Sequence, residues 1–517
     1  MAQRFVESGR VGGSHCWGGC EAVVKCPGRP IRNRPQVSNL PHIAIICVLG
    51  AASLTAANRA PVPAVESKPH ACRVQNIPGE VLCATYPVWE NRERKSGRKI
   101  GLNIVILPAL GPEHAPDPVF MLHGGPGAAA TQLAAGVFRF RARARRDFVF
   151  IDQRGTGGSN PLDCDFYGDP PDLQKAVSGT FPADAVRDCR ERLSKIADLA
   201  MYTTAAGMDD VDDVRQWLGY DKINVWGGSY GTVAAQVYLR RHGSHARTVF
   251  LGGVAPVDEL IPLHHAWAGQ RAVDILFDKC RADAECNSAY PNLREEFRTI
   301  LDRVRKGVDV SIKGPDGKVV RVRPSLSAFA EGIRHSLYYD DGRTFPAMIH
   351  RAAGGELAPL IEKGINANLN LDGLLSMGMN LSVTCSEDVP YIDDATLARE
   401  TANTFLGDLR VKEQRAACKE WVGGEVPADV HQLVHSDVPV LLMSGARDSV
   451  TPPSYAEHVA KQLPNSLHVV FPESSHGNWG LCGYQLWADL IERGSVKGLD
   501  VSCVARQKPV KFAIGTN

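Results

Sequence analysis

Gly227-Gly228-Ser229-Tyr230-Gly231 lies between a short apolar run at residues 222–226 and a helical pattern at residues 232–239. The apolar run is typical of a buried strand, and the helical pattern has small residues on one face. A G-x-S-x-G pattern alone also occurs in ordinary glycine-rich turns, but between a strand and a helix it is typical of a nucleophile elbow. The glycines allow a sharp turn there, so we predict that the Ser229 hydroxyl is exposed at the start of the helix.

A serine nucleophile requires a base and an acid that orients the base, and after such an elbow the acid precedes the histidine in the chain. Two apolar runs near the C-terminus are each followed by a polar loop, which contains Asp448 in the first case and His476 in the second. The other two histidines of this region, His458 and His468, fall in a helical pattern and inside a strand. We therefore predict a catalytic triad of Ser229, His476 and Asp448.

A glycine-rich segment, His123-Gly124-Gly125-Pro126-Gly127, follows another apolar run. Glycines at such a place let backbone N–H groups approach a developing oxyanion without obstruction by side chains. We predict that the N–H groups of Gly125 and Tyr230 form the oxyanion hole. His123 precedes the serine in the chain, so it is expected to brace this loop and not to transfer protons.

Together these motifs resemble the α/β-hydrolase superfamily and, more narrowly, its proline iminopeptidase and tripeptidyl aminopeptidase branch. A further mark of that branch is Asp152-Gln-Arg-Gly-Thr-Gly-Gly-Ser159, and the resemblance covers roughly residues 70–505. It implies an α/β-hydrolase fold, a mostly parallel sheet flanked by helices, with an inserted and mainly helical cap domain. We expect Asp152 and Arg154 to hold the loops around the site by a local ion pair.

The organisation of the chain agrees with this resemblance. Its 517 residues are too many for one simple core, and its composition is ordinary for a globular protein. Apolar runs alternate with helical patterns as far as residue 251, which predicts βαβ units; the runs are 98–107, 118–122, 146–151, 222–226 and 247–251. Strands resume at 438–443 and 467–471. The predicted divisions are a leader at 1–57, a first core part at 58–261, a helical cap at 262–435 and a second core part at 436–517.

Within the predicted cap, helical patterns cover 265–282 and 293–306, and residues 308–323 form a candidate hairpin. Before the cap, residues 208–218 form an amphipathic helix with four aspartates. These acids could suggest a metal site, but acids early in a helix suit the helix dipole and solvent. We therefore expect no metal and no cofactor.

Export is predicted from the N-terminus and from the cysteines. Residues 42–57 form an apolar run that ends in small residues and follows several arginines, as in a secretory signal peptide. About 40 residues precede this run, for which we infer a misplaced start site; a genuine long leader and a retained membrane anchor are the alternatives. Ten of the 14 cysteines lie beyond the leader, and an even number in an exported chain favours disulfides over a zinc site. The expected pairs are sequence neighbours: Cys72/Cys83, Cys164/Cys189, Cys280/Cys286, Cys385/Cys418 and Cys482/Cys503.

Two adjacent acids, Glu387 and Asp388, lie beside one of these cysteines. Aminopeptidases of the branch that the chain resembles bind the free α-amine of the substrate through carboxylates of the cap, and the resemblance implies this role for Glu387 and Asp388. The alternative is that both are solvated loop acids. The net charge of +1 argues against nucleic acid as a partner.

These observations predict a monomeric serine aminopeptidase, exported to the periplasm or out of the cell, without an integral membrane span in its mature chain. It would hydrolyse peptide bonds near the free N-terminus of a peptide through an acyl-enzyme. A carboxylic-ester hydrolase on the same triad is the first alternative, because a fold does not fix a function. A non-catalytic binding protein is the second. The sequence leaves open how many residues are released and whether proline is preferred.

Overall fold

The computed structural model of the chain describes residues 66–314, 317–338 and 342–515. The chain divides into two units, Met1–Val62 and Pro63–Asn517, and the second unit contains every described residue. The predicted leader with its signal peptide, and the first four cysteines, lie outside the described residues.

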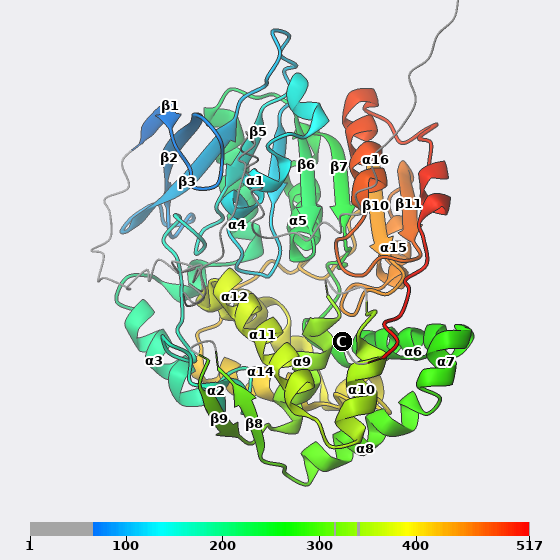
Figure 1. The fold of residues 1–517 in the computed structure, drawn as a ribbon. Coiled ribbons are helices and arrows are strands. Elements are labelled where there is room, and N and C mark those ends of the chain that lie inside the picture. Colours follow the sequence, from blue (N-terminus) through cyan, green and yellow to red (C-terminus); the bar gives the residue numbers. More distant parts are fainter. Residues whose placement is uncertain (1–65, 315–316, 339–341, 516–517) are drawn as a thin grey trace, which may run out of the picture. The chain divides into compact units, whose positions relative to one another are not determined.

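Within the described residues, nine strands form one sheet in the order β1-β2-β3-β5-β4-β6-β7-β10-β11 (Figure 1). From β5 to β11 all neighbours pair in parallel, whereas β1, β2, β3 and β5 pair antiparallel. The predicted α/β-hydrolase sheet, mostly parallel, is therefore confirmed. The strands are β1 Ser67–Cys72, β2 Val81–Trp89, β3 Lys99–Leu107, β4 Val119–Leu122, β5 Phe148–Ile151, β6 Ile223–Gly228, β7 Ala246–Gly252, β10 Val440–Gly445 and β11 Ser466–Phe471.

Helices cover both faces of this sheet, which explains why the central strands β4 and β5 are apolar throughout. In β4, Phe120 and Leu122 pack with α4, α5 and α15 on one face, and Val119 and Met121 pack with α1 and α16 on the other. Successive side chains of a strand point to opposite faces, so a strand covered on both sides loses its polar positions. The helices of the core are α1 Ala134–Val137, α4 Thr204–Trp217, α5 Tyr230–His242, α15 Pro453–Ala460 and α16 Gly480–Arg493.

A mainly helical region separates β7 from β10, and Figure 1 shows its helices gathered beyond one end of the strands. The helical patterns expected at 265–282 and 293–306 correspond to α6 and α8, and the hairpin candidate corresponds to β8 and β9. The elements are α6 His265–Ala282, α7 Ala284–Ala289, α8 Leu293–Arg305, β8 Val310–Lys313, β9 Val319–Val322, α9 Leu326–Ser336, α10 Phe345–Ala353, α11 Ala358–Leu374, α12 Met377–Glu387, α13 Asp394–Thr401 and α14 Leu409–Glu420. Two further helices, α2 Leu173–Ala176 and α3 Ala183–Leu193, come before β6. Over the described residues, the structure contains no helix with the length and apolar character needed to cross a membrane.

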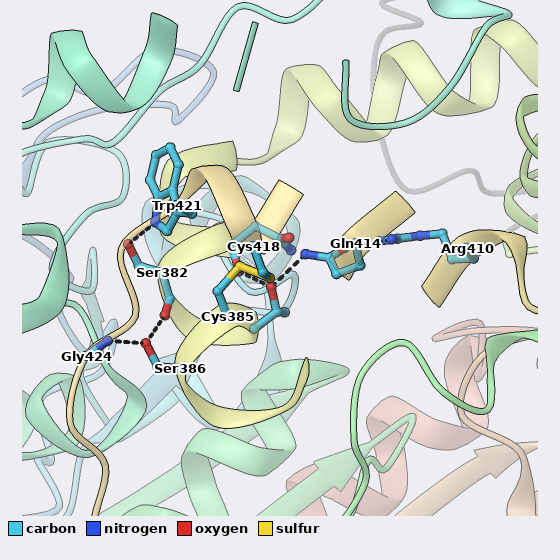
Figure 2. The surroundings of a disulfide bond; sticks show 10 residues. Ser382, Cys385, Ser386, Arg410, Gln414, Cys418, Trp421 and Gly424 are labelled. Atoms are coloured by element: carbon cyan, nitrogen blue, oxygen red, sulfur yellow. Dashed lines mark hydrogen bonds between the residues drawn. A yellow bond between two sulfur atoms is a disulfide. The ribbon is translucent and has the colours of Figure 1, made fainter. Parts of the chain in front are cut away.

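Five disulfides link the ten described cysteines, and each joins two sequence neighbours as predicted. Their Cα–Cα distances are 5.2–5.8 Å, within the ordinary range for disulfides. Figure 2 shows the bridge between Cys385 and Cys418, which joins α12 to α14.

The expected ion pair between Asp152 and Arg154 is wrong. Arg154 is fully buried and donates to both carboxylate oxygens of Asp210, at 2.7 and 2.9 Å. Asp152 instead accepts hydrogen bonds from the backbone N–H groups of Thr131 and Gly158. The aspartates of α4 were expected in its first turn, facing solvent. The helix begins at Thr204, so they lie in its middle, and Asp210 there pairs with Arg92 and Arg154.

Candidate active site

Ser229 occupies the turn between β6 and α5 with φ 56° and ψ −128°. A positive φ at a residue other than glycine costs about 1–3 kcal/mol and persists only where neighbours impose it. Here the Ser229 N–H donates to the Gly252 carbonyl at 2.9 Å. The N–H and hydroxyl of Thr232 both donate to the Ser229 carbonyl, at 2.8 and 2.6 Å. The serine is thus held in a strained turn at the carboxyl end of a parallel strand, as the sequence predicts.

Asp448 and His476 come together from the loops that follow β10 and β11. Asp448 Oδ2 lies 2.8 Å from His476 Nδ1, and the two residues are 0% and 5% exposed. The Thr451 hydroxyl donates to the same carboxylate oxygen at 2.7 Å, and the N–H groups of Val450 and Thr451 donate to the other at 2.9 and 2.8 Å. The carboxylate therefore accepts hydrogen bonds at both of its oxygens.

These contacts set the charge state of the pair. Burial alone would raise the pKa of Asp448, but His476 and the hydrogen bonds from Thr451 outweigh burial and lower this pKa. An ionised Asp448 accepts the Nδ1–H of a neutral His476, which leaves Nε2 of the imidazole able to take up a proton. The arrangement can therefore supply a general base.

Two glycines at the end of β7 connect the serine turn with the histidine loop. Gly252 accepts the N–H of Ser229, as described above. A methyl group added at Gly253 would lie 3.0 Å from Cε1 and 3.2 Å from Nδ1 of His476. The His476 imidazole therefore lies beside Gly253, and the neighbouring Gly252 holds the backbone of Ser229. β6, β7, β10 and β11 are parallel neighbours, so their following loops meet at the same edge of the sheet.

The glycine-rich segment after β4 lies against the serine. A methyl group added at Gly124 would lie 2.9 Å from Ser229 Cβ and 3.4 Å from its Oγ. Gly125 has a φ of 113°, which only glycine adopts readily. Within residues 66–314, 317–338 and 342–515, neither the Gly125 N–H nor the Tyr230 N–H donates to another protein group. Two backbone donors are thus available beside the serine.

His123 has a partner within its own loop. Its Nδ1 accepts the N–H of Gly124 at 2.7 Å. Burial lowers the pKa of His123 to about 4, so this imidazole is neutral near pH 7. A neutral ring that accepts a loop N–H fits the bracing role expected from the sequence.

The helical region also contacts the loops that carry the acid and the base. The backbone N–H of His476 donates to the Tyr338 carbonyl at 2.8 Å, and the Ser449 hydroxyl donates to the Arg334 carbonyl at 3.1 Å. Arg334 lies in the last turn of α9, and Tyr338 lies in the turn that follows this helix. The position of this helix therefore affects the position of the imidazole.

Glu387 and Asp388 lie at the C-terminal end of α12 and are 5% and 7% exposed, which excludes the interpretation as solvated loop acids. Glu387 accepts the N–H of Thr204 with one oxygen and the hydroxyl of Thr204 with the other, both at 2.6 Å. Burial raises the pKa of Glu387 to about 7. Burial, followed by the negative charges of Glu387 and Glu259, raises the pKa of Asp388 well above its usual value.

These acids line a small pocket with about 350 Å³ of empty space, part of it open to solvent. Its lining combines three carboxyl groups with apolar side chains and includes the residue that follows the serine; the residues are Tyr230, Val233, Val237, Val257, Glu259, Ile261, Val383, Glu387, Asp388, Val430 and His431. Sequence reasoning missed Glu259. Its position in the loop after β7, at the carboxyl edge of the sheet, is the signal that could have identified it.

The two other histidines near the C-terminus have partners elsewhere. His458 Nε2 lies 2.8 Å from Asp258 Oδ2, and His468 Nε2 lies 2.9 Å from Ser444 Oγ. Sequence reasoning also missed Thr451, which follows Val450; the Val450 N–H, two residues after Asp448, closes a turn with the Asp448 side chain and is the local signal. In the part of the chain that the structure describes, no group of three or more His, Cys, Asp or Glu side chains could hold a metal ion.

Comparison with known proteins gives two family matches and several curated relatives. Residues 117–272 match a family described as alpha/beta hydrolase fold, and residues 403–503 match one described as TAP-like protein. The serine protease Hip1 of Mycobacterium tuberculosis is 28% identical over 236 residues, which cover 42% of this chain and 45% of that protein. A tripeptidyl aminopeptidase of Streptomyces lividans is 28% identical over 473 residues, which cover 84% of this chain and 86% of that protein.

Among solved structures, a proline iminopeptidase of Mycobacterium smegmatis is 16% identical, with a TM-score of 0.37 over 79% of this chain and 98% of that one. The alignment with Hip1 spans less than half of the length of that protease. The first family match contains β4 to β7, and the second contains β10 and β11. Most of the helical region lies between the two matches. The chain therefore has an α/β-hydrolase fold, its residues 403–503 match a TAP-like family, and the curated relatives named above are peptidases.

Proposed function

We propose that this chain is an exported serine aminopeptidase that hydrolyses peptide bonds near a free N-terminus through Ser229, His476 and Asp448. The buried contact between Asp448 and His476 carries the proposal, because it lies at the same edge of the sheet as the strained turn of Ser229. Two of the relatives are a serine protease and a tripeptidyl aminopeptidase, which supports a peptide as the substrate.

In the proposed reaction, His476 Nε2 takes the proton of the Ser229 hydroxyl as Oγ attacks the carbonyl carbon of the scissile bond. The charge that develops on the carbonyl oxygen is stabilised by the N–H groups of Gly125 and Tyr230. The imidazolium then gives its proton to the leaving amine, which departs and leaves an acyl-enzyme. A water molecule, deprotonated by the same imidazole, attacks this ester and regenerates the serine.

The carboxyl groups of Glu387 and Asp388 are proposed to bind the α-ammonium group of the substrate. Their pocket includes Tyr230, so an amine held there would lie close to the residue that follows the nucleophile. A buried carboxylate that faces an ammonium group forms a charge-assisted hydrogen bond, which an acetylated N-terminus cannot provide. Selection for free N-termini follows from this difference.

Export is proposed from the five disulfides, because such bonds persist in oxidising compartments. The signal peptide at 42–57 lies outside the described residues, and we propose cleavage near Ala57. The cap at 262–435 is proposed to be the domain that limits access to the site. We propose a monomer.

The test compares three chromogenic substrates: a tripeptide arylamide with a free N-terminus and its N-acetylated form, which both release an arylamine, and a simple aryl ester, which releases a phenol. A peptidase of the proposed kind hydrolyses the free amide much faster than the acetylated one. Turnover of the ester alone would favour the ester hydrolase. If the chain turned over none of the three and its serine did not react with a fluorophosphonate, the binding protein would be favoured.

A further inference from the structure

Thr204 connects the end of α12 to the residue that follows the nucleophile. Its hydroxyl lies 2.6 Å from Glu387 Oε2 and also 2.6 Å from the phenolic oxygen of Tyr230. The three residues are 1%, 5% and 4% exposed, so solvent hardly reaches these contacts. They form a buried chain of hydrogen bonds between α12, α4 and α5.

When Glu387 is ionised, the direction of this chain of hydrogen bonds follows from the number of protons available. A threonine hydroxyl has one proton, and here it is donated to Glu387. Burial, followed by the negative charge of Glu387, raises the pKa of Tyr230 well above its usual value, so the phenol keeps its proton. The phenol therefore donates to Thr204, and Thr204 donates to Glu387. Every polar atom of the contact then has a partner.

The anchored tyrosine matters because of its backbone. The direction of the Tyr230 N–H depends on the ψ angle of Ser229, which is −128° in a strained turn. A strained turn relaxes unless its neighbours hold it. The hydrogen bonds of Gly252 and Thr232 fix the serine side of this peptide unit. The phenol of Tyr230 fixes the other side.

Glu387 is itself held in place by the residues that precede it in α12. Cys385 is bonded to Cys418 of α14, and the Ser386 hydroxyl accepts the N–H of Gly424 at 2.8 Å (Figure 2). Gln414 of α14 donates to the Thr384 hydroxyl at 2.9 Å. The carboxylate at the end of the hydrogen-bond chain is thus attached to a rigid pair of helices.

We propose that Thr204 is a positioning residue for the oxyanion hole: with Glu387 as its anchor it holds Tyr230 so that the backbone N–H of this tyrosine faces the developing oxyanion. The inference rests on the proposed serine-hydrolase function. It adds a residue that touches neither the substrate nor the reacting atoms, 25 positions before the nucleophile in the chain.

The test uses Thr204→Val and Tyr230→Phe in the full chain, with the neutral ester and the free-amine tripeptide amide as substrates. Removing one oxyanion donor costs about 10²–10³-fold in kcat, so a donor that is only misdirected should cost about tenfold. Both variants should lose kcat on both substrates with little change in KM. The double variant should lose no more than either single one, because both changes break the same contact. Thr204→Ser, which keeps the hydroxyl, should restore kcat.

Tyr238→Phe is the matched control. Tyr238 lies on the same helix, is fully buried, and donates its hydroxyl to Asp212 at 2.9 Å, away from the serine. It should lower the Tm as Tyr230→Phe does and leave kcat unchanged. If Thr204→Val does not fold, Tyr230→Phe alone gives the answer.

Two results separate the failure of this inference from the failure of the proposed function. If Tyr230→Phe kept the wild-type kcat while the separate variant Ser229→Ala was inactive, the proposed role of Thr204 would be overturned. The proposed serine-hydrolase function would stand. A wild-type chain that turns over neither substrate and does not react with a fluorophosphonate would overturn both.

Discussion

His476 Nδ1 and Asp448 Oδ2 lie 2.8 Å apart in a part of the molecule that solvent hardly reaches. In such surroundings a charge-assisted hydrogen bond is stronger than in water, and an unpaired charge is correspondingly costly. Thr451 donates to the same carboxylate oxygen and lies 3.1 Å from the same ring nitrogen, so it fixes both groups. The orientation of the imidazole is therefore determined before any substrate binds.

Replacement of the nucleophile is the first prediction. Ser229→Ala should reduce turnover by about 10⁴- to 10⁶-fold, the usual effect of removing a triad residue. The Tm should change little, because alanine removes only one hydroxyl group. Steady-state kinetics and thermal unfolding of the purified variant check both statements. A variant that kept a tenth of the wild-type rate would show that another residue is the nucleophile.

The base is tested by a pair of histidine variants. His476→Ala should be as damaging as the serine change, because no other imidazole contacts Asp448 in the described part of the chain. His468→Ala is the control, since this histidine lies in β11 and contacts Ser444. It should keep a rate close to that of the wild type. Equal losses in the two variants would contradict the assignment.

Two glycines with a positive φ provide a test of the contact between the end of β7 and His476. Gly253 has φ 62°, and a methyl group there would lie 3.0 Å from the imidazole; Gly219 has φ 82° and open space around it. Either alanine variant should destabilise the fold by about 1–2 kcal/mol, because an L-residue is strained at a positive φ.

Only Gly253→Ala should also displace the imidazole, and small displacements of a catalytic group cost up to about 10²-fold in rate. We therefore expect a reduced kcat for Gly253→Ala and an unchanged one for Gly219→Ala at equal temperature below both Tm values. An unchanged kcat in both variants would contradict the assignment of the His476 imidazole as the catalytic base.

Much of this site could be predicted from the sequence, because its signals are local. Strands β4 and β5 are short and fully apolar, and the serine, the acid and the base each follow a short strand that is mostly apolar. The antiparallel strands β1 and β2 are absent from the sequence analysis; β1 is short and mostly exposed, so it has no apolar pattern. Local patterns therefore identify the parallel strands that carry the site.

Contacts between distant segments could not be predicted in this way. Arg154 pairs with Asp210, 56 positions further on, and not with the nearby Asp152. Thr204 and Glu387 are 183 positions apart, and their contact depends on how α4 packs against α12. Such pairs follow from the packing of whole elements, which no short pattern encodes.

The stability of the fold should depend on pH through Glu387. Burial raises its folded pKa from the ordinary value of 4.5 to about 7. Between these values the folded chain binds more protons than the unfolded chain, so the contribution of Glu387 to stability falls as pH rises from 4.5 to 7. Below 4.5 the group is protonated in both states and has no such effect.

Glutamine cannot ionise, so the Tm of Glu387→Gln minus that of the wild type should rise between pH 4.5 and 7 and level off above this range. The other titratable groups that face this carboxyl group are Asp388, Glu259, His431 and Tyr230, and all four remain in the variant. Thermal unfolding at a series of pH values measures the difference. Parallel Tm curves for the two proteins would show that burial does not shift the pKa of this acid.

Substrate selection provides the last prediction, which separates the two roles of Glu387. A charge-assisted contact with the substrate ammonium is worth roughly 1.5–3 kcal/mol, so its loss should raise KM for free-amine peptides about ten- to a hundredfold. In Glu387→Gln the side-chain carbonyl can still accept the Thr204 N–H, and the amide N–H₂ can donate to the Thr204 hydroxyl. The anchor of Tyr230 is then kept, and hydrolysis of a neutral ester should barely change. N-acetylated peptides should be poor substrates of the wild type and should gain little from the substitution. Equal losses on free and acetylated peptides would mean that Glu387 supports the fold and does not bind the amine.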